Sequence, residues 1–223
     1  GSEMCIRDSL VDDLEPNTQY YVRAYAENSA GLSYGNQVTF STNFEVLDVD
    51  SNLYHGITIG GQVWLQEDLR VSRYNNLDPI PNLTDQSDWT TTHEGAWCYY
   101  NNEQDDIYGK LYNWFAVNDT SGLCPAGWRI PSTNDWITLI DYLGGEKVAG
   151  GKLKMPDGYW ESPNTGADGS TLFEALPGGY RTFTNGDFLL KGKYGYWWTS
   201  NEPNSNVAPH LILLHNSSGI GLT

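Results

Sequence analysis

The strongest helical pattern of the chain lies between Ser132 and Gly144. Ser132 and Asp135 stand three residues apart, as in a capping box, and Gly144 is typical of a position just past a helix C-terminus. Four apolar side chains recur at helical spacing along this run: Trp136, Leu139, Ile140 and Leu143. Because they share one face, the pattern predicts a helix that packs one apolar stripe against a core.

Most of the remaining pattern has the two-residue period of β-strands. A second helix is predicted within 108–117, whereas 28–35, 75–95 and the Gly- and Pro-rich stretch 146–168 are expected to be irregular. Strands are predicted at 19–27, 36–41, twice within 54–65, and at 97–100, 128–130, 180–183, 187–190 and 194–200. The strand at 194–200 does not alternate, so we expect it to be buried on both faces.

A short acidic segment separates the first strands from the rest of the chain. Asp48, Asp50 and Asn52 have the alternate oxygen ligands that open an EF-hand calcium loop. Leu53 stands where that loop needs glycine, and Ile59 stands where it needs a closing Glu. A hairpin turn is therefore the preferred interpretation, with calcium binding as the alternative.

The composition is acidic and rich in aromatic residues, with a formal net charge of -16, 9 Trp, 15 Tyr and 24 Gly. Such a surface repels phosphate groups, which argues against nucleic acid and anionic lipid as partners. The aromatic and glycine content favours an extracellular, turn-rich β protein. No apolar run reaches the length of a membrane span.

The first residues, 1–9 (GSEMCIRDS), have neither the layout of a signal peptide nor a strand or helix pattern. We interpret them as a cloning or assembly remnant and leave Cys5 out of the argument. Cys98 and Cys124 remain, which are too few for a disulfide scaffold and lack zinc-ligand spacing.

Residues 10–43 form a unit with its own pattern. The run LEPNTQYYVRAYAENSAG (14–31) resembles the end of a fibronectin type III sandwich, where a tyrosine corner precedes a hairpin. Only the last strands of such a sandwich are present, so we expect the tail of an all-β module truncated at the start of the sequence. An independent hairpin attached to the next domain is the alternative.

Six later blocks occur in one order: ITIGGQVWLQEDL (57–69), WCYYNN (97–102), YGKLYNWFAV (108–117), LCPAGWRIPSTNDW (123–136), LPGGYR (176–181) and YGYWWTS (194–200). Together they resemble the Fibrobacter succinogenes major paralogous domain, a family of secreted bacterial proteins. The block at 123–136 is more distantly similar to an element of C-type-lectin-like and formylglycine-generating folds.

The resemblance implies an α+β, C-type-lectin-like domain over 46–223, with two helices and antiparallel sheets, that lacks its last strand. It also implies that Cys124 has lost a disulfide partner in that strand, so we expect its thiol to react readily with a maleimide. The apolar stretch 207–215 would then be an exposed contact surface or an open sheet edge.

Catalytic motifs give little support to an enzyme. None of the four histidines, His55, His93, His210 and His215, lies in a nucleophile motif. Formylglycine-generating enzymes place paired active-site cysteines near the C-terminal end, a context that this sequence lacks. Acidic pairs are expected by chance among 28 acids, and we interpret them as solvated surface.

Glu202-Pro203-Asn204 resembles the sugar-selecting EPN triplet of mannose-type C-type lectins, in which these oxygens ligate calcium. The downstream WND of those lectins is absent, so a turn is the preferred interpretation and calcium the minority one. The resemblance places ligand surfaces near the C-terminal end of the fold. The candidate binding residues are Glu202, Asn204, Asn206, His210, Trp97 and Tyr99.

The sequence therefore predicts a noncatalytic binding or adhesion module without a required cofactor. We expect it to recognise a glycan or a protein at a bacterial cell surface, anchored to the outer membrane through an N-terminal signal outside this sequence. The alternative is an enzyme related to the formylglycine-generating fold, and a purely structural surface role ranks third.

Overall fold

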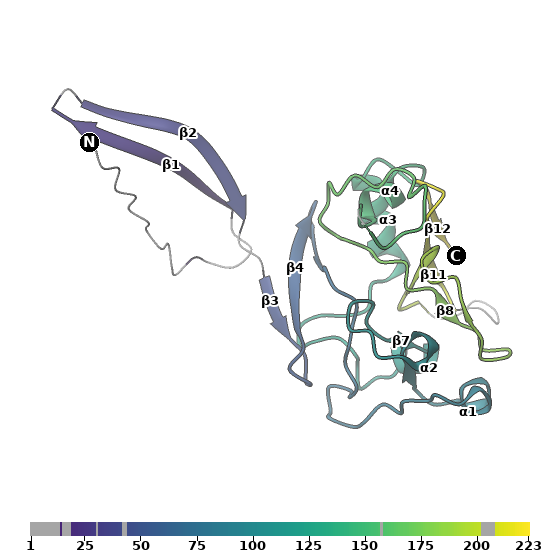
Figure 1. The fold of residues 1–223 in the computed structure, drawn as a ribbon. Coiled ribbons are helices and arrows are strands. Elements are labelled where there is room, and N and C mark those ends of the chain that lie inside the picture. The colour runs from purple at the N-terminus through teal and green to yellow at the C-terminus, as the bar shows by residue number, and fades with distance from the viewer. Residues whose placement is uncertain (1–13, 15–18, 30, 42–43, 157, 202–207) are drawn as a thin grey trace, which may run out of the picture. The chain divides into compact units, whose positions relative to one another are not determined.

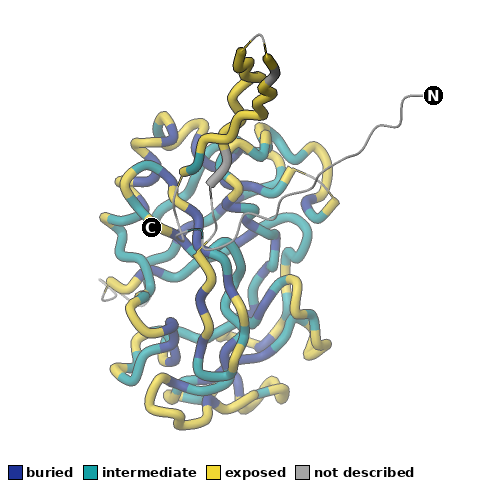
Figure 2. The backbone as a smooth tube through the Cα atoms, turned by 90° about the vertical axis from the view of Figure 1, so that its left-hand side faces the viewer, coloured by how far each residue is buried: buried dark blue, intermediate teal, exposed yellow. Residues whose placement is uncertain are grey.

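The computed structural model describes residues 14, 19–29, 31–41, 44–156, 158–201 and 208–223 (Figure 1). The chain divides into two compact units, residues 1–45 and 46–223. The larger unit is mixed and mostly sheet, with short antiparallel strands and few helices. Figure 2 shows that buried positions are concentrated in the larger unit, while the described residues of the smaller one are almost all exposed.

The smaller unit contains one antiparallel hairpin, β1 (Gln19–Asn28) and β2 (Gly31–Ser41). Both predicted strands are confirmed, but the predicted loop over 28–35 is wrong. The strands pair up to Asn28 opposite Gly31, so the turn is much tighter than expected. Gly31 has a φ of 137°, which only glycine adopts readily, and it allows the chain to reverse there.

The larger unit begins with the sheet β3 (Phe44–Leu47), β4 (Leu53–Ile59) and β5 (Gln62–Leu65), as the alternation predicted for the last two. The acidic segment between β3 and β4 is the expected turn. The Asp48 carboxylate accepts hydrogen bonds from the backbone N–H groups of Asp50 and Asn52 and from the Tyr54 hydroxyl, at 2.8 to 2.9 Å. Its oxygens are thus occupied by protein donors, as a turn requires.

The segment expected to be irregular contains α1 (Gln86–Thr91). Asp85 accounts for it, because its side chain accepts hydrogen bonds from the backbone N–H groups of Ser87 and Asp88 at the helix start. The strand expected at 97–100 is shorter: β6 (Trp97–Cys98) ends there, and a 3-10 turn follows.

The helix predicted within 108–117 is mostly wrong. Gly109 has a φ of 66°, and a Cβ there would lie 2.8 Å from the Leu69 carbonyl oxygen, so the chain bends beside residue 69. The next residues form β7 (Leu111–Tyr112), which pairs with β6. Asn113 then caps α2 (Trp114–Val117), which is a single turn. The apolar spacing that predicted one helix belongs to a strand followed by a turn.

The predicted helix after Ser132 is confirmed as α3 (Thr133–Tyr142). The Ser132 hydroxyl accepts from the Asp135 N–H at 3.3 Å, and the Asp135 carboxylate accepts from the Ser132 N–H at 2.7 Å, which is a capping box. The predicted strand at 128–130 is wrong. The chain leaves a Pro125 turn there, and the exposed Arg129 side chain reaches Asp135 instead of joining a sheet.

A helix that was not expected, α4 (Ala149–Leu153), lies in the Gly-rich connection. Its glycines allow close approach of other segments. A Cβ on Gly150 would lie 2.2 Å from the Gly219 carbonyl oxygen, and one on Gly151 would lie 2.4 Å from that of Gly166. These glycines therefore let α4 pack directly on backbone.

In the C-terminal half, the strands predicted at 180–183 and 187–190 are present in a shorter form as the antiparallel pair β8 (Tyr180–Arg181) and β9 (Phe188–Leu189), followed by β10 (Tyr194–Trp198). β10 pairs with β11 (His210–Leu214), and β11 pairs with β12 (Ile220–Leu222).

The expectation that 207–215 is an exposed surface or open edge is wrong for the described residues 208–215. β11 is the central strand of this sheet, and Leu211 and Leu213 are 1% and 0% exposed in the core. The expectation that the 194–200 strand is buried on both faces is also wrong, since most of β10 is only half-buried.

Two buried cations join distant segments. The Lys154 ammonium, in a residue that is 1% exposed, donates to the backbone carbonyls of Thr165, Leu214 and Ser217 at 2.8 to 3.0 Å. The buried Arg181 guanidinium donates to the carbonyls of Gly186, Leu83, Thr84 and Asp85 at 2.6 to 3.1 Å. Each buried cation thus finds its hydrogen-bond acceptors on the backbone of several segments.

No helix among the described residues is long and apolar enough to cross a membrane.

Trp136 should be the largest single contributor to the core. It is 1% exposed, and its ring centroid lies 4.6 Å from that of Trp64 and 6.1 Å from that of Phe173. Replacing Trp136 by Ala should lower the free energy of unfolding by about 3 to 5 kcal/mol, because it leaves a large cavity. Urea denaturation measures this, and the exposed Ile137→Ala serves as control. A loss below about 1 kcal/mol would contradict the helix register.

Candidate functional site

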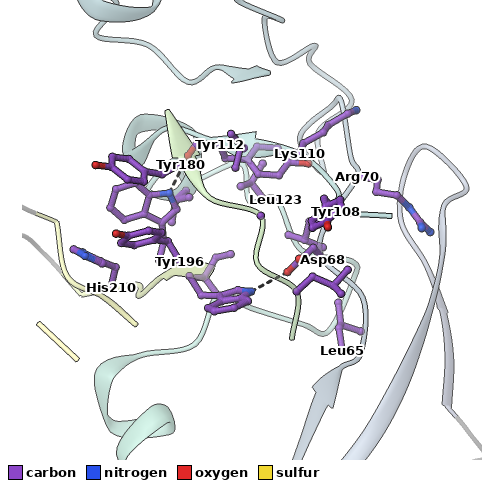
Figure 3. A pocket seen from close by; sticks show the side chains of 18 of the residues that line it. Leu65, Asp68, Arg70, Tyr108, Lys110, Tyr112, Leu123, Tyr180, Tyr196 and His210 are labelled. Carbon is purple, nitrogen blue, oxygen red and sulfur yellow. Dashed lines mark hydrogen bonds between the residues drawn. The ribbon is translucent and has the colours of Figure 1, made fainter. Parts of the chain in front are cut away.

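A cleft with a volume of about 1910 Å³ lies in the larger unit, bordered by β5, β7, β8, β10 and β11 (Figure 3). Aromatic side chains make up much of its wall, and they come from segments far apart in the sequence. Figure 3 labels four of its tyrosines: Tyr108, Tyr112, Tyr180 and Tyr196. A cleft of this kind, mostly apolar with a few polar groups, is the usual form of a ligand site.

One wall is a continuous series of five rings, which we call the aromatic row: Tyr180, Tyr196, His210, Trp198 and Trp114. Along the row, neighbouring ring centroids lie 4.9, 5.7, 5.9 and 5.9 Å apart. Strand geometry explains this row. Tyr196 and Trp198 are two residues apart and lie on the same face of β10, and His210 lies opposite Trp198 on the neighbouring strand. Burial raises the pKa of the Tyr196 hydroxyl to about 12, so this group is a neutral donor at neutral pH.

Trp197 points to the other side of β10 and forms the floor of the cleft. Its ring lies over Gly195, where a Cβ would stand only 2.2 Å from the indole. Its indole N–H donates to Oδ1 of Asp68 at 2.8 Å (Figure 3). Glycine at position 195 is therefore required for the ring to reach residue 68.

Asp68 is the ionisable group at this floor. It is half-buried, because the cleft opens onto it, and Gly109 packs so closely that an added Cβ would lie 2.9 Å from the Asp68 Cβ. Burial raises the pKa of its carboxyl group to about 6, and the Trp197 hydrogen bond offsets only part of that effect. No basic side chain is among the causes of the shift.

The family model described as the Fibrobacter succinogenes major domain matches residues 57–219. The chain belongs to this family. The match contains Asp68, Trp197 and the whole aromatic row. No curated protein and no solved structure matches the chain.

Of the predicted binding residues of the major domain, the three that the structure describes do not come together. Glu202, Asn204 and Asn206 lie outside the described residues. His210 lines the cleft and belongs to the aromatic row, while Trp97 and Tyr99 are absent from the cleft lining.

Trp97 and Tyr99 lie in a second cluster of the major domain. Trp97 is 8% exposed, and its indole N–H donates to the Ile80 carbonyl at 2.9 Å. The half-buried Tyr99 packs its ring against Trp97 at 5.4 Å and donates its hydroxyl to Asp106 at 3.1 Å. Both side chains thus have protein partners that hold the 97–106 segment.

Sequence reasoning missed Asp68, Tyr196 and Trp198. A signal was present in the aromatic 194–200 strand, whose lack of alternation was interpreted as burial on both faces. In the major domain, one face of β10 carries the aromatic row and the other carries Trp197. Asp68 gave no signal of its own, because its partner lies 129 residues along the chain.

The two cysteines of the major domain are both free and buried. Burial raises the pKa of the Cys98 thiol to about 11, beside Arg181, and that of the Cys124 thiol to about 12. Thiolates are therefore disfavoured at both positions. Among the described residues, no group of three or more His, Cys, Asp and Glu side chains is arranged to hold a metal ion.

Burial reverses the expectation that Cys124 reacts readily. Its thiol is protonated and only 7% exposed, so maleimide labelling of the native protein should be at least about tenfold slower than labelling in denaturant. Peptide mapping by mass spectrometry separates Cys124 from the other cysteines. Equal rates in native and denaturing buffer would show that the segment around Cys124 is open.

Asp68 should destabilise the fold at neutral pH. Its native pKa, about 6, lies above the unfolded value of 3.8, so its stabilising proton is bound below pH 4 and lost as pH rises through 6. Asp68→Asn should therefore raise the free energy of unfolding by about 1 to 2 kcal/mol at pH 7.5 and not at pH 4.

Urea denaturation at both pH values measures this effect. Asp106→Asn is the matched control, because it removes the same charge from an exposed acid of the same cleft. An equal effect of the two substitutions, or a loss of stability in Asp68→Asn at both pH values, would contradict the assigned environment of Asp68.

Proposed function

We propose that this major domain is a noncatalytic binding module that recognises a glycan or a protein at a bacterial cell surface. The observation that carries the proposal is the aromatic row beside the cleft floor. Rings that are half-buried and face a cleft offer flat apolar contact at low entropic cost, and Tyr and Trp dominate binding energies elsewhere for this reason.

Polar groups in the cleft give such contacts a direction. The neutral Tyr196 hydroxyl and the His210 imidazole belong to the row, and the Asp68 carboxylate lines the same cleft beside Trp197. A few convergent polar groups within an apolar wall are what orients a small ligand. Stacking on the rings would provide the buried contact area, and these polar groups would select ligands by the positions of their hydroxyl groups.

The alternative, an enzyme of the formylglycine-generating type, has less support. That chemistry uses reactive cysteines, whereas Cys98 and Cys124 are buried thiols with raised pKa values. Cys98 packs with Trp89 and Ala96 in one cluster. Cys124 lines the cleft but has no thiol partner, since both cysteines are free.

The fold assignment behind the proposal is also our own. We propose a C-type-lectin-like arrangement for the larger unit and a fibronectin type III origin for the β1–β2 hairpin. Extracellular modules commonly combine such units, and the acidic, aromatic composition is consistent with that setting. His210, on the central strand β11, supports a ligand surface near the C-terminal end of the domain.

The test is binding to glycan and surface-protein arrays, with and without calcium. Tyr196→Ala and His210→Ala should each weaken binding by about tenfold, because each removes one ring of the aromatic row. Tyr142→Ala is the matched control, an exposed tyrosine of α3 that does not line the cleft.

Retention of full binding by both cleft variants would place the ligand elsewhere and contradict the proposal. Binding that disappears only without calcium would instead favour lectin chemistry at Glu202 and Asn204. Circular dichroism confirms that each variant is folded.

A further inference from the structure

We infer that the cleft takes a glycan that carries a free amino group, and that the ammonium of this sugar binds the Asp68 carboxylate. The inference rests on the proposed binding function and names the class of its ligand. It follows from two observations. One oxygen of the Asp68 carboxylate accepts no hydrogen bond among the described residues, and the Lys and Arg side chains of the cleft bind other protein groups.

Asp68 uses only one of its two carboxylate oxygens within the described part of the chain. Oδ1 accepts from the Trp197 indole at 2.8 Å, which fixes the plane and position of the carboxylate. Among the described residues, no donor bonds Oδ2, and no cation pairs with the group. Figure 3 shows the side chain at the cleft wall between Tyr108 and Leu65. One oxygen is therefore held in place while the other is left for a ligand.

The basic side chains of the cleft are all bound to other protein groups. Arg70 donates to the Leu53 carbonyl at 2.7 Å, and Lys110 donates to the Ser72 hydroxyl with its ammonium 3.8 Å from the Trp97 ring centroid.

The two remaining cleft arginines are engaged as well. Arg129 pairs with Asp135 through two bonds, of 2.5 and 2.8 Å. Arg181 donates to four carbonyl oxygens of the backbone, as described above. The four Lys and Arg side chains that line the cleft thus all have protein partners, and none of them pairs with Asp68.

Even a half-buried carboxylate is costly without a cation, because burial penalises its charged form. The raised pKa of Asp68 is the sign of that cost. Groups of this kind persist where they serve a ligand, since stability is given up for function at binding sites. A ligand ammonium would remove the penalty by providing the missing charge and the donor for Oδ2.

The surroundings favour an amino sugar over other amines. The indole of Trp197 and the aromatic row offer π faces, which attract both a cation and the C–H groups of a pyranose ring. The sugar with the amino group would lie against Trp197 and Asp68, and further sugars of the chain would reach the aromatic row on the other face of β10. The net charge of -16 adds a long-range attraction for a cationic glycan.

The experiment is isothermal titration of the full chain with three oligosaccharides of equal length and linkage, built from glucosamine, N-acetylglucosamine and glucose. They differ only at the carbon that bears the amino group. A lysine-containing peptide of equal charge is the fourth probe. Each is measured at neutral pH with the unmodified chain, Asp68→Asn and Asp106→Asn.

We expect the glucosamine oligomer to bind most tightly to the unmodified chain, and Asp68→Asn to weaken it by about tenfold or more, as for loss of a charged hydrogen bond. Asp106→Asn, with the same change of net charge, should alter its affinity less than about twofold. The neutral oligomers should bind more weakly and should not distinguish Asp68→Asn from the unmodified chain.

Three outcomes would overturn the inference. They are equal binding of the glucosamine oligomer by Asp68→Asn, equal weakening by Asp106→Asn, and preference for the lysine peptide over every glycan. Tight binding of a neutral oligomer that still depends on Tyr196 would refute the amino-sugar class alone. Absence of any ligand that depends on Tyr196 and His210 would refute the proposed function itself.

Discussion

The larger unit depends on buried cations that bond backbone rather than carboxylates. Lys154 joins α4 to the end of β11 through the Leu214 carbonyl, and to two connecting segments through Thr165 and Ser217. Arg181 does the same for β8, and the other residue of that strand, Tyr180, begins the aromatic row. Because the sheets are only two or three strands wide, these bonds hold together pieces that strand pairing alone cannot. The cleft exists between parts fixed in this way.

The well-fixed surroundings of the cleft allow it to keep Asp68, a carboxylate whose burial is unfavourable. Asp68 is placed by Trp197, by the missing Cβ of Gly109 and by the missing Cβ of Gly195. None of these contacts neutralises its charge. The contacts that stabilise the rest of the fold therefore offset the unfavourable free energy of the Asp68 charge. The carboxylate stays oriented and open to a ligand. The same logic explains why β10 has aromatic side chains that are only half-buried: their remaining surface faces the cleft.

Local patterns predicted the local structure well. Ser132 and Asp135 are close in sequence, and so the capping box and α3 followed from spacing, as did the Asp48 turn and the strands β8 and β9. Predictions failed where contact with a distant segment determines the local structure. At Gly109, close approach to Leu69 bends the chain, and the strand β7 follows where a helix was expected. In the candidate site, His210 was named from the sequence and lines the cleft, whereas the Asp68–Trp197 pair joins segments that no local pattern connects.

The central claim, that ligands bind between Asp68 and the aromatic row, can be tested through the indole N–H signals of the protein. Trp197 and Trp198 donate to Asp68 and to the Tyr112 carbonyl in the cleft, while Trp97 and Trp160 donate to the carbonyls of Ile80 and Ala175 in the interior. In a nuclear magnetic resonance titration with the glucosamine oligomer, the account predicts saturable shifts of the Trp197 and Trp198 signals and unchanged Trp97 and Trp160 signals. Saturable binding that leaves the Trp197 and Trp198 signals unmoved would contradict it.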